Sequence, residues 1–321
     1  MLKNEKVKNA LHDFLKYHGS LVVFLFIWLV AAIFVESFAT LDNMLNIVKQ
    51  AAIPTITCLG VTCVLMIGGI DLSVGYTVGL CSYMSGYFVV LHNIPIPVAI
   101  LLTLCIGAIC GLFNGVLVKL VKMPPFIVTL GSGYIIYGLA QMISDGTFIC
   151  PLPQEFLAVA RSQFAGLPAF VWISAVIVCL FYFLMHKTTF GRALSSIGYN
   201  IHASKLSGIN DDFVVIICYT ISGVCAAIVG ILMSLRVNNC TPILGISEHT
   251  FTVITGAVLG GASLSGGKGK ATGAVLGMLT IMIIENVITL AHINYYIYSA
   301  ALSIIILGAL VFESQKNKAL Q

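Results

Sequence analysis

The segment GGIDLSVG, residues 68–75, places one aspartate among glycines between two apolar stretches. A charged side chain at the centre of a bilayer costs about 2.5–3.5 kcal/mol on insertion scales. Asp71 is therefore expected at a membrane edge or beside a wet cavity. Because Asp is a good N-cap and glycines permit a break, we expect Asp71 to cap a helix that starts near Ser73. A break between two spans is also where a transport pathway tends to be lined.

The segment GASLSGGKGK, residues 261–270, is superficially similar to a nucleotide-binding loop. A P-loop requires G-x-x-x-x-G-K-[ST] after a strand. The nearest frame starts with Ala262 and ends with Gly269, so the hydroxyl that would bind Mg²⁺ is missing. We expect a tight basic turn instead, in which Lys268 and Lys270 meet a partner protein or anionic headgroups.

Glu285, next to Asn286, is the best candidate for an ionisable group that serves ion-coupled transport. Carriers of that kind place such groups near the bilayer midplane, paired and facing a cavity. The alternative is a protonated or hydrogen-bonded glutamate inside the bundle, or one that lines a polar pathway. Asp71, Glu285 and the peripheral Glu36 are the only acidic residues in the predicted spans.

No group of residues indicates catalysis or metal binding. The seven histidines are scattered, and no H-E-x-x-H, G-x-S-x-G or carboxylate pair occurs. The ten cysteines lie mostly in apolar runs without C-x-x-C or Cys/His ligand spacing, which is typical of small buried thiols. A disulfide between the loop residues Cys150 and Cys240 is an alternative that the sequence neither supports nor excludes. We expect no enzyme and no resident cofactor.

The elements that position these residues are membrane helices. The 321 residues are 59% apolar and only 9% charged, whereas soluble domains carry about 25% charge. The net charge of +4 in such a chain is no indication of nucleic-acid binding. At about 20 apolar residues per span, the sequence predicts ten spans: 20–38, 51–69, 74–91, 96–118, 125–143, 169–186, 213–235, 249–265, 271–291 and 295–312.

The distribution of Lys and Arg predicts the orientation of these spans. With alternating spans and an inside N-terminus, the outside loops hold only Lys49, Arg161 and Arg236. The inside segments hold Lys3, Lys6, Lys8, Lys16, Lys119, Lys122, Lys187, Arg192, Lys205, Lys268, Lys270, Lys316 and Lys318. We therefore expect an all-α polytopic membrane protein with a single domain, 20–312, between cytoplasmic tails 1–19 and 313–321.

Two features between and within the spans carry further predictions. Loop 187–212 has glycine turns at residues 191–192 and 198–200 around short amphipathic runs, which favours a helix lying on the inside face. Such a helix is a docking surface for a soluble partner, or a plain interface helix. Within one span, Gly107, Gly111 and Gly115 form a double G-x-x-x-G, which is typical of close helix packing.

Four blocks of sequence resemble the permease subunit of ribose-type ATP-binding cassette (ABC) sugar importers, whose relatives carry ribose, xylose, arabinose, galactose or autoinducer-2. The blocks follow one another in the family's order and spacing, between about Thr40 and Phe312. They are GGIDLSVG (68–75), FNGVLVKLVKMPPFIVTLG (113–131), TTFGRALSSIGYNIHASKLSGI (188–209) and GAVLGGASLSGGKGKATGAVLG (256–277).

The resemblance implies roles for individual residues. The family's G-I-D-L-S-x-G block falls beside the translocation pathway, for which we single out Gly68, Gly69, Asp71, Ser73, Glu285 and Asn286. Its P-F-[IV]-x-T-L-G block falls on Pro125, Phe126, Ile127, Thr129, Leu130 and Gly131. The resemblance implies a coupling region that contacts an ATPase at Phe190, Gly191, Arg192, Gly198, Asn200, Ala203, Ser207, Gly208 and Ile209.

One stretch departs from the family's pattern. Where the family usually has Glu and then a run rich in Ala, Glu248 is followed by HTFTVIT, residues 249–255. Bulkier and more polar residues at an inner wall change pore shape or substrate. The sequence therefore does not identify the sugar.

The resemblance also implies partners and a place in the cell. Two ATPase modules, which hold ATP and Mg²⁺, dock on the inside face of the cytoplasmic membrane, and a sugar-binding protein docks on the outside face. A second permease copy or a homologue completes the pore. The chain itself is then a non-catalytic, multi-pass subunit. The rival interpretations are an ion-coupled secondary carrier of a small polar solute and a receptor or structural membrane protein.

Overall fold

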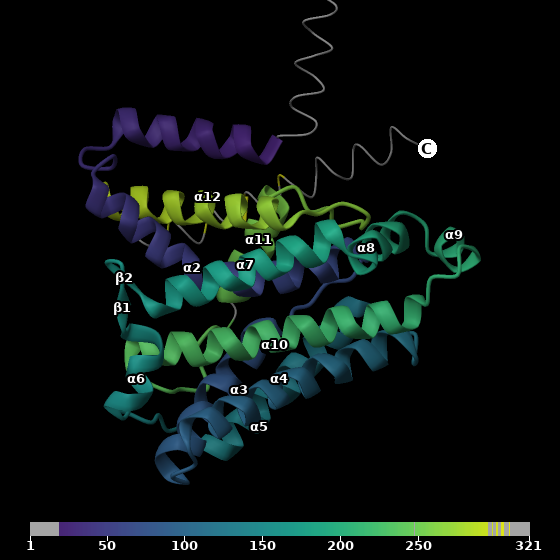
Figure 1. Cartoon of the computed structure of the whole chain (residues 1–321), viewed down its shortest axis with the longest axis horizontal. Coiled ribbons are helices and arrows are strands. Elements are labelled where there is room, and N and C mark those ends of the chain that lie inside the picture. The colour runs from purple at the N-terminus through teal and green to yellow at the C-terminus, as the bar shows by residue number, and fades with distance from the viewer. Residues whose placement is uncertain are drawn as a thin grey trace, which may run out of the picture.

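The computed structural model describes residues 19–246 and 248–294, together with the single positions 297, 300, 303, 304 and 308. Long helices lie side by side and run between two ends of the molecule (Figure 1). One end, here the α6 end, carries α6 (Gln154–Arg161) and a hairpin of β1 (Gln163–Phe164) and β2 (Leu167–Pro168). The other, the α8 end, carries α8 (Thr189–Tyr199) and α9 (Ile201–Leu206).

Seven helices in the described part of the chain are long and apolar enough to cross a membrane. Three of them run toward the α8 end: α2 (Leu41–Met66), α4 (Ile96–Lys119) and α7 (Ala169–Lys187). Four run back: α3 (Val74–Gly86) with its π-helical continuation η1 (Tyr87–Leu91), α5 (Pro125–Ser144), α10 (Asp211–Val237) and α12 (Ala271–Leu290). A shorter apolar helix, Gly19–Phe34, precedes them, and α11 (Glu248–Leu259) lies between α10 and α12.

The predicted span 249–265 is wrong in length. Helix α11 has 12 residues and rises about 18 Å, whereas the hydrocarbon core of a bilayer is about 30 Å thick. It ends at Leu259 because glycines follow, and Gly261, Gly266 and Gly267 take positive φ angles that a helix cannot contain.

Other predicted spans differ from the helices at their ends. The span predicted from residue 51 starts at Leu41, where Thr40 caps α2, and the first apolar helix ends at Phe34. The predicted span 295–312 lies outside the continuously described residues. The count of ten spans and the cytoplasmic placement of both termini therefore stay predictions.

Helix α10 packs against α2, α3 and α4 and forms the centre of the bundle. Its contact with α4 depends on glycine: a Cβ on Gly107 would overlap the Gly223 carbonyl oxygen, and one on Gly111 would overlap the Tyr219 carbonyl oxygen. A Cβ on Gly115 would lie 2.8 Å from the Ile216 Cα. The prediction of close packing at the double G-x-x-x-G is confirmed.

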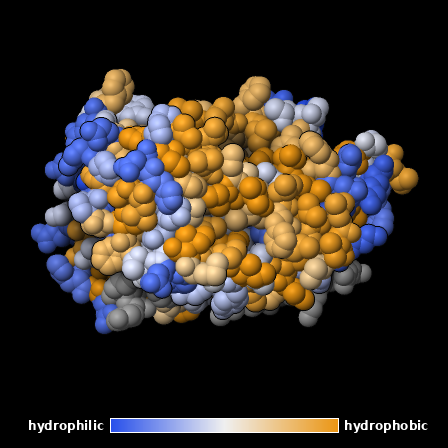
Figure 2. Space-filling model, turned by 90° about the horizontal axis from the view of Figure 1, so that it is seen from below, coloured by the Kyte–Doolittle hydropathy of each residue, from blue (hydrophilic) through white to orange (hydrophobic). Residues whose placement is uncertain are grey.

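The surface of the bundle is apolar between its two ends. Figure 2 shows a continuous hydrophobic band across the middle of one face, with hydrophilic residues gathered at both ends of the long axis. Large apolar side chains exposed on α4, α5 and α7 include Leu101, Ile109, Ile135, Leu180 and Phe183. This is the surface of a protein whose helices lie in lipid, and it identifies a multi-pass membrane protein.

The glycine contacts between α4 and α10 predict the effect of one added methyl group. We expect Gly111→Ala to lower the melting temperature in detergent, because overpacking typically costs about 1–3 kcal/mol. The matched control is Gly138→Ala on α5, where a Cβ would have no neighbour within 4 Å and Ala is favoured over Gly in a helix. Equal melting temperatures for the two variants would contradict the close contact.

Candidate functional site

Asp71 lies in the short connection between α2 and α3 and is almost fully buried, with 2% of its surface exposed. The Ser73 backbone N–H and hydroxyl donate to its Oδ1 at 3.0 and 2.6 Å, and the Ser222 hydroxyl of α10 donates to Oδ2 at 2.7 Å. Asn114 of α4 donates from Nδ2 to the Ser73 hydroxyl at 2.8 Å. The carboxylate therefore ties the start of α3 to α10 and, through Ser73, to α4.

The same connection receives two further hydrogen bonds from neighbouring helices. The hydroxyls of Thr129 on α5 and Tyr219 on α10 donate to the Ile70 carbonyl at 3.2 and 3.4 Å. Ser73, not Asp71, is the N-cap of α3. The predicted capping by Asp71 is wrong by two positions, because its carboxylate instead accepts the N–H of the cap residue.

The residues predicted for the translocation pathway lie in three different surroundings. Gly68 and Gly69 line a pocket of about 550 Å³ at the α8 end. Glu285 lines a larger cavity, toward the α6 end. Asp71 and Ser73 line neither of these two cavities, since their side chains are taken up by the buried network.

Asn286, the neighbour of Glu285, joins two helices. Its side-chain amide exchanges two hydrogen bonds with that of Asn43 on α2, at 2.8 and 2.9 Å. Such amide pairs stabilise helix contacts inside a membrane protein. Because Asn286 faces α2, its neighbour Glu285 on α12 is held toward the cavity.

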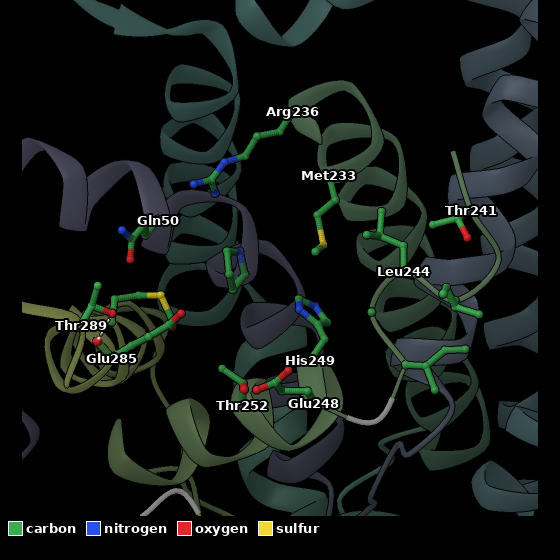
Figure 3. A pocket seen from close by; sticks show the side chains of 15 residues that line it. Gln50, Met233, Arg236, Thr241, Leu244, Glu248, His249, Thr252, Glu285 and Thr289 are labelled. Carbon is green, nitrogen blue, oxygen red and sulfur yellow. Dashed lines mark hydrogen bonds between the residues drawn. The ribbon is translucent and has the colours of Figure 1, made fainter. Parts of the chain in front are cut away.

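The larger cavity has a volume of about 710 Å³ and is bounded by α2, α10, α11, α12 and the loop before α11. Figure 3 shows Arg236 reaching into it from α10 toward Gln50, with Glu285 on α12 and with Glu248 and His249 contributed by α11. On α2, Pro54 has no N–H to donate to the Gln50 carbonyl, one turn before it. The wall of the cavity thus coincides with an interruption in the hydrogen bonding of α2.

Sequence reasoning assigned Arg236 to an outside loop, but it lies in the last turn of α10. Lys49, assigned to another outside loop, lies on α2. The Arg236 guanidinium lies 5.6 Å from the ring centroid of Phe170, a cation–π distance. Arg161 of α6 donates to the Leu235 and Arg236 carbonyls at 2.7 and 2.9 Å, so the α6 end anchors the turn that carries Arg236.

The stretch that departs from the family's pattern forms α11 and part of the cavity wall. His249 and Thr252 line the cavity, and the His249 Nε2 lies 2.8 Å from the Thr57 hydroxyl of α2. Thr250 turns the other way and accepts a hydrogen bond from the Gly75 N–H at 3.1 Å. The polar residues that replace an Ala-rich run therefore connect α11 to α2 and to α3.

At the α8 end, residues 187–212 form two helices rather than one. The predicted glycine turn at Gly191 and Arg192 is wrong, since both lie inside α8, whose N-cap is Thr188. A Cβ on Gly191 would overlap the Met185 carbonyl, so the glycine allows α8 to fold tightly against the end of α7. The second turn, predicted over residues 198–200, is present only at Asn200, which ends α8 and caps α9, since Gly198 lies inside α8.

The predicted coupling residues divide into exposed and packed sets. The exposed side chains or backbone positions are Arg192, Asn200, Ala203, Ser207 and Gly208. Gly191 is buried, and Phe190, Gly198 and Ile209 are half-buried. Lys268 and Lys270 are exposed at this same end, in the loop between α11 and α12. These exposed residues all lie at the α8 end of the molecule.

Gly198 is one of the points where α8 meets the rest of the molecule. A Cβ on Gly198 would overlap both the Met66 carbonyl oxygen and the Gly267 nitrogen. The Gly267 N–H itself donates to the Met66 carbonyl at 2.8 Å. Three segments far apart in the sequence, namely α8, the end of α2 and the loop before α12, therefore touch backbone to backbone.

The connection after α9 is fixed by charge. The Lys119 ammonium at the end of α4 pairs with Asp211 and, at 3.2 Å, with Asp212, the first residues of α10. Lys205 of α9 lies 3.5 Å from Asp211. Among the described residues, no three His, Cys, Asp or Glu side chains gather as metal ligands would. All ten cysteines are free thiols, including Cys150 and Cys240.

The described helices form a lipid-facing bundle with a hollow toward each end, an arrangement that suits a membrane transport subunit. Residues 43–312 match the family model described as "branched-chain amino acid transport system / permease component". The chain belongs to this family of permease components, and the resemblance to ABC importer permeases is confirmed.

Curated relatives align with this chain over most of its length. The ribose import permease protein of Haemophilus influenzae is 29% identical over 318 residues, 98% of each chain. The L-arabinose transport system permease protein of Escherichia coli K12 is 33% identical over 310 residues, 94% of this chain and 92% of its own. The autoinducer 2 import system permease protein of Salmonella paratyphi B is 31% identical over 287 residues, which are 89% of this chain and 82% of its own. No solved structure matches significantly.

The network around Asp71 predicts a graded response to substitution. We expect Asp71→Ala to destabilise the protein strongly, because each buried donor left without an acceptor costs about 1–3 kcal/mol. Asp71→Asn keeps one acceptor oxygen for Ser73, so its loss of melting temperature is expected to be smaller. Asp145→Asn, at an exposed helix end, is the control. An Asp71→Ala variant as stable as the control would contradict the network.

Proposed function

We propose that this chain is the transmembrane permease subunit of an ABC importer that carries an uncharged sugar across the cytoplasmic membrane. The observation that carries the proposal is the set of relatives named for ribose, L-arabinose and autoinducer 2, which align over most of their own length and of this chain. ATP hydrolysis then belongs to a separate ATPase subunit, which holds the ATP and Mg²⁺. The description of the family names branched-chain amino acids, which are the second substrate class to test.

The two ends of the bundle take different partners in this proposal. The α8 end is cytoplasmic and binds the ATPase through Arg192, the exposed face of α8 and α9, and the basic loop at Lys268 and Lys270. The α6 end is extracytoplasmic and receives the sugar-binding protein, and a second permease copy or homologue completes the pathway. The distribution of Lys and Arg supports this orientation.

Movement of the ATPase reaches the cavity through the contact at Gly198. Because α8 touches Met66 and Gly267 backbone to backbone, a displacement of α8 moves the end of α2 and the loop before α12 together. The end of α2 leads to Asp71 and α3. The loop before α12 joins α12 to α11, and these two helices carry Glu285 and Glu248. A rigid contact of this kind transmits a shift because no flexible side chain absorbs it.

Reconstitution decides between the substrate classes and the mechanisms. We expect the chain, in proteoliposomes with its ATPase and binding protein, to take up D-ribose or L-arabinose only when ATP is supplied. Uptake of L-leucine with neither sugar transported would favour the amino acid. Uptake driven by a proton or sodium gradient without any ATPase would favour a secondary carrier, and Glu285 is then the first residue to replace.

The contact at Gly198 predicts uncoupling by one methyl group. Gly198→Ala forces α8 away from Met66 and Gly267, so we expect ATP hydrolysis to continue while sugar uptake falls at least about tenfold. Gly138→Ala on α5 is the control, because a Cβ there has open space. The ratio of sugar transported to ATP hydrolysed is the measurement. An unchanged ratio in Gly198→Ala would show that α8 does not act through this contact.

The exposed residues of the α8 end predict a second class of variant. We expect Arg192→Ala to stay in the membrane with normal stability, because its side chain is exposed, but to lose ATPase binding and uptake. Gly208, at φ +79°, is expected to lose coupling when a bulky residue replaces it. Co-purification of the ATPase is the measurement, and full uptake by both variants would count against docking here.

A further inference from the structure

The cavity toward the α6 end is lined by three charged side chains among the described residues. Arg236 is positive, and Glu248 and Glu285 are negative. With His249 neutral, the lining carries one more negative charge than positive. The aliphatic part of the wall consists of Pro54, Met233, Ile243, Leu244, Ile246 and Met282.

Arg236 and Glu285 face this cavity without a direct ion pair between them. Among the described residues, the Arg236 guanidinium makes no ion pair, and it lies against the Phe170 ring instead. The Glu285 carboxylate accepts no hydrogen bond from a described residue; the contact with Thr289 goes to its backbone carbonyl. Charged groups in a membrane bundle are costly unless they pair or meet a polar ligand or water.

The positions of both side chains are fixed from outside the cavity. Arg161 binds the carbonyl of Arg236 itself, and the Phe170 ring supports its guanidinium. The Asn43–Asn286 amide pair sets the rotation of α12 at Glu285. Two anchored groups of opposite charge, on α10 and α12, therefore stand ready on the walls of one cavity (Figure 3).

The chemistry of these groups selects one class of ligand. A guanidinium only donates hydrogen bonds and a carboxylate only accepts them, whereas each hydroxyl of a polyol does both. The hydroxyls of one polyol can therefore serve both kinds of group, one accepting from Arg236 and another donating to Glu285. A sugar phosphate would place about 1.5 to 2 negative charges beside two carboxylates, an arrangement that opposes binding.

The lining also indicates weak binding. Pockets that bury most of a ligand's surface are lined mainly by hydrophobic and aromatic side chains, and this cavity has no Phe, Tyr or Trp among its described lining residues. A ligand that must leave again at each transport cycle requires such a site.

We propose that this cavity is a low-affinity site for an uncharged ligand with several hydroxyl groups, which bonds to the Arg236 guanidinium and the Glu285 carboxylate, and that its two glutamates reject phosphorylated sugars. The proposal rests on the function proposed above. It adds a selection step in the permease itself, after delivery of the ligand and independent of the binding protein.

Saturation-transfer NMR on the complete transporter in lipid nanodiscs, without nucleotide and without binding protein, tests the site. We expect signals from D-ribose or L-arabinose and none from D-ribose 5-phosphate or L-leucine. Equal signals from D-ribose and D-ribose 5-phosphate, or no signal from either free sugar, would overturn the proposal. This comparison uses the unmodified protein, so misfolding cannot explain its outcome.

Two variants assign the effect to the named side chains. Glu285→Gln is expected to weaken sugar binding about tenfold, the effect of losing one charge-assisted hydrogen bond. The matched control is Glu36→Gln, at an exposed position outside the cavity. The double variant Glu248→Gln/Glu285→Gln leaves Arg236 as the charged lining residue, and we expect it to gain binding of D-ribose 5-phosphate. If the double variant does not bind D-ribose 5-phosphate, the two glutamates do not reject phosphorylated sugars through their charge.

ATP-driven uptake by the same complex with its binding protein separates this inference from the proposed function. If uptake is normal while Glu285→Gln and Glu36→Gln bind sugar alike, the site is wrong and the importer stands. If no ATP-driven uptake of sugar occurs but the free sugars still require Glu285 for binding, the site stands and the importer is wrong.

Discussion

Close contact between backbones, made possible by glycine, is the constraint on which this structure depends. In lipid, apolar side chains gain little by packing on one another, so helices associate where small residues let their backbones meet. Gly107 and Gly111 bring α4 onto α10, and Gly198 brings α8 onto Met66 and Gly267. Close backbone contact thus builds the bundle and also attaches α8 to it.

Buried polar groups supply the second set of connections, because a polar group inside a membrane bundle must find its partner there. Asp71 joins the α2–α3 connection to α10 through Ser222, and Asn286 joins α12 to α2 through Asn43. Glu285 is the contrast: its carboxylate faces a cavity, with no hydrogen bond to a described residue. Asp71 fixes the positions of helices in the bundle, whereas Glu285 faces the space that a ligand would occupy.

The two ends of the molecule are linked by this framework. At the α6 end, Arg161 anchors the last turn of α10, which carries Arg236 into the cavity. At the α8 end, Gly198 contacts Met66, where the connection from α2 to α3 begins, and Gly267, in the loop between α11 and α12. The walls of one cavity are therefore connected to both ends of the molecule. In the proposed importer, this arrangement relates delivery of the ligand to the nucleotide cycle.

The sequence by itself determined the membrane class, the family, the helix packing at Gly107 and Gly111, and the basic residues of the α8 end. These follow from composition, from residue spacing along one helix and from motifs that are continuous in the chain. Only the tertiary structure decided that α11 stops short, that Asp71 is buried and bonded, that Asn286 pairs with Asn43, and that Arg236 shares a cavity with Glu285. Each of these depends on segments far apart in the chain, and spacing within one helix carries no information on which face of it another helix will cover.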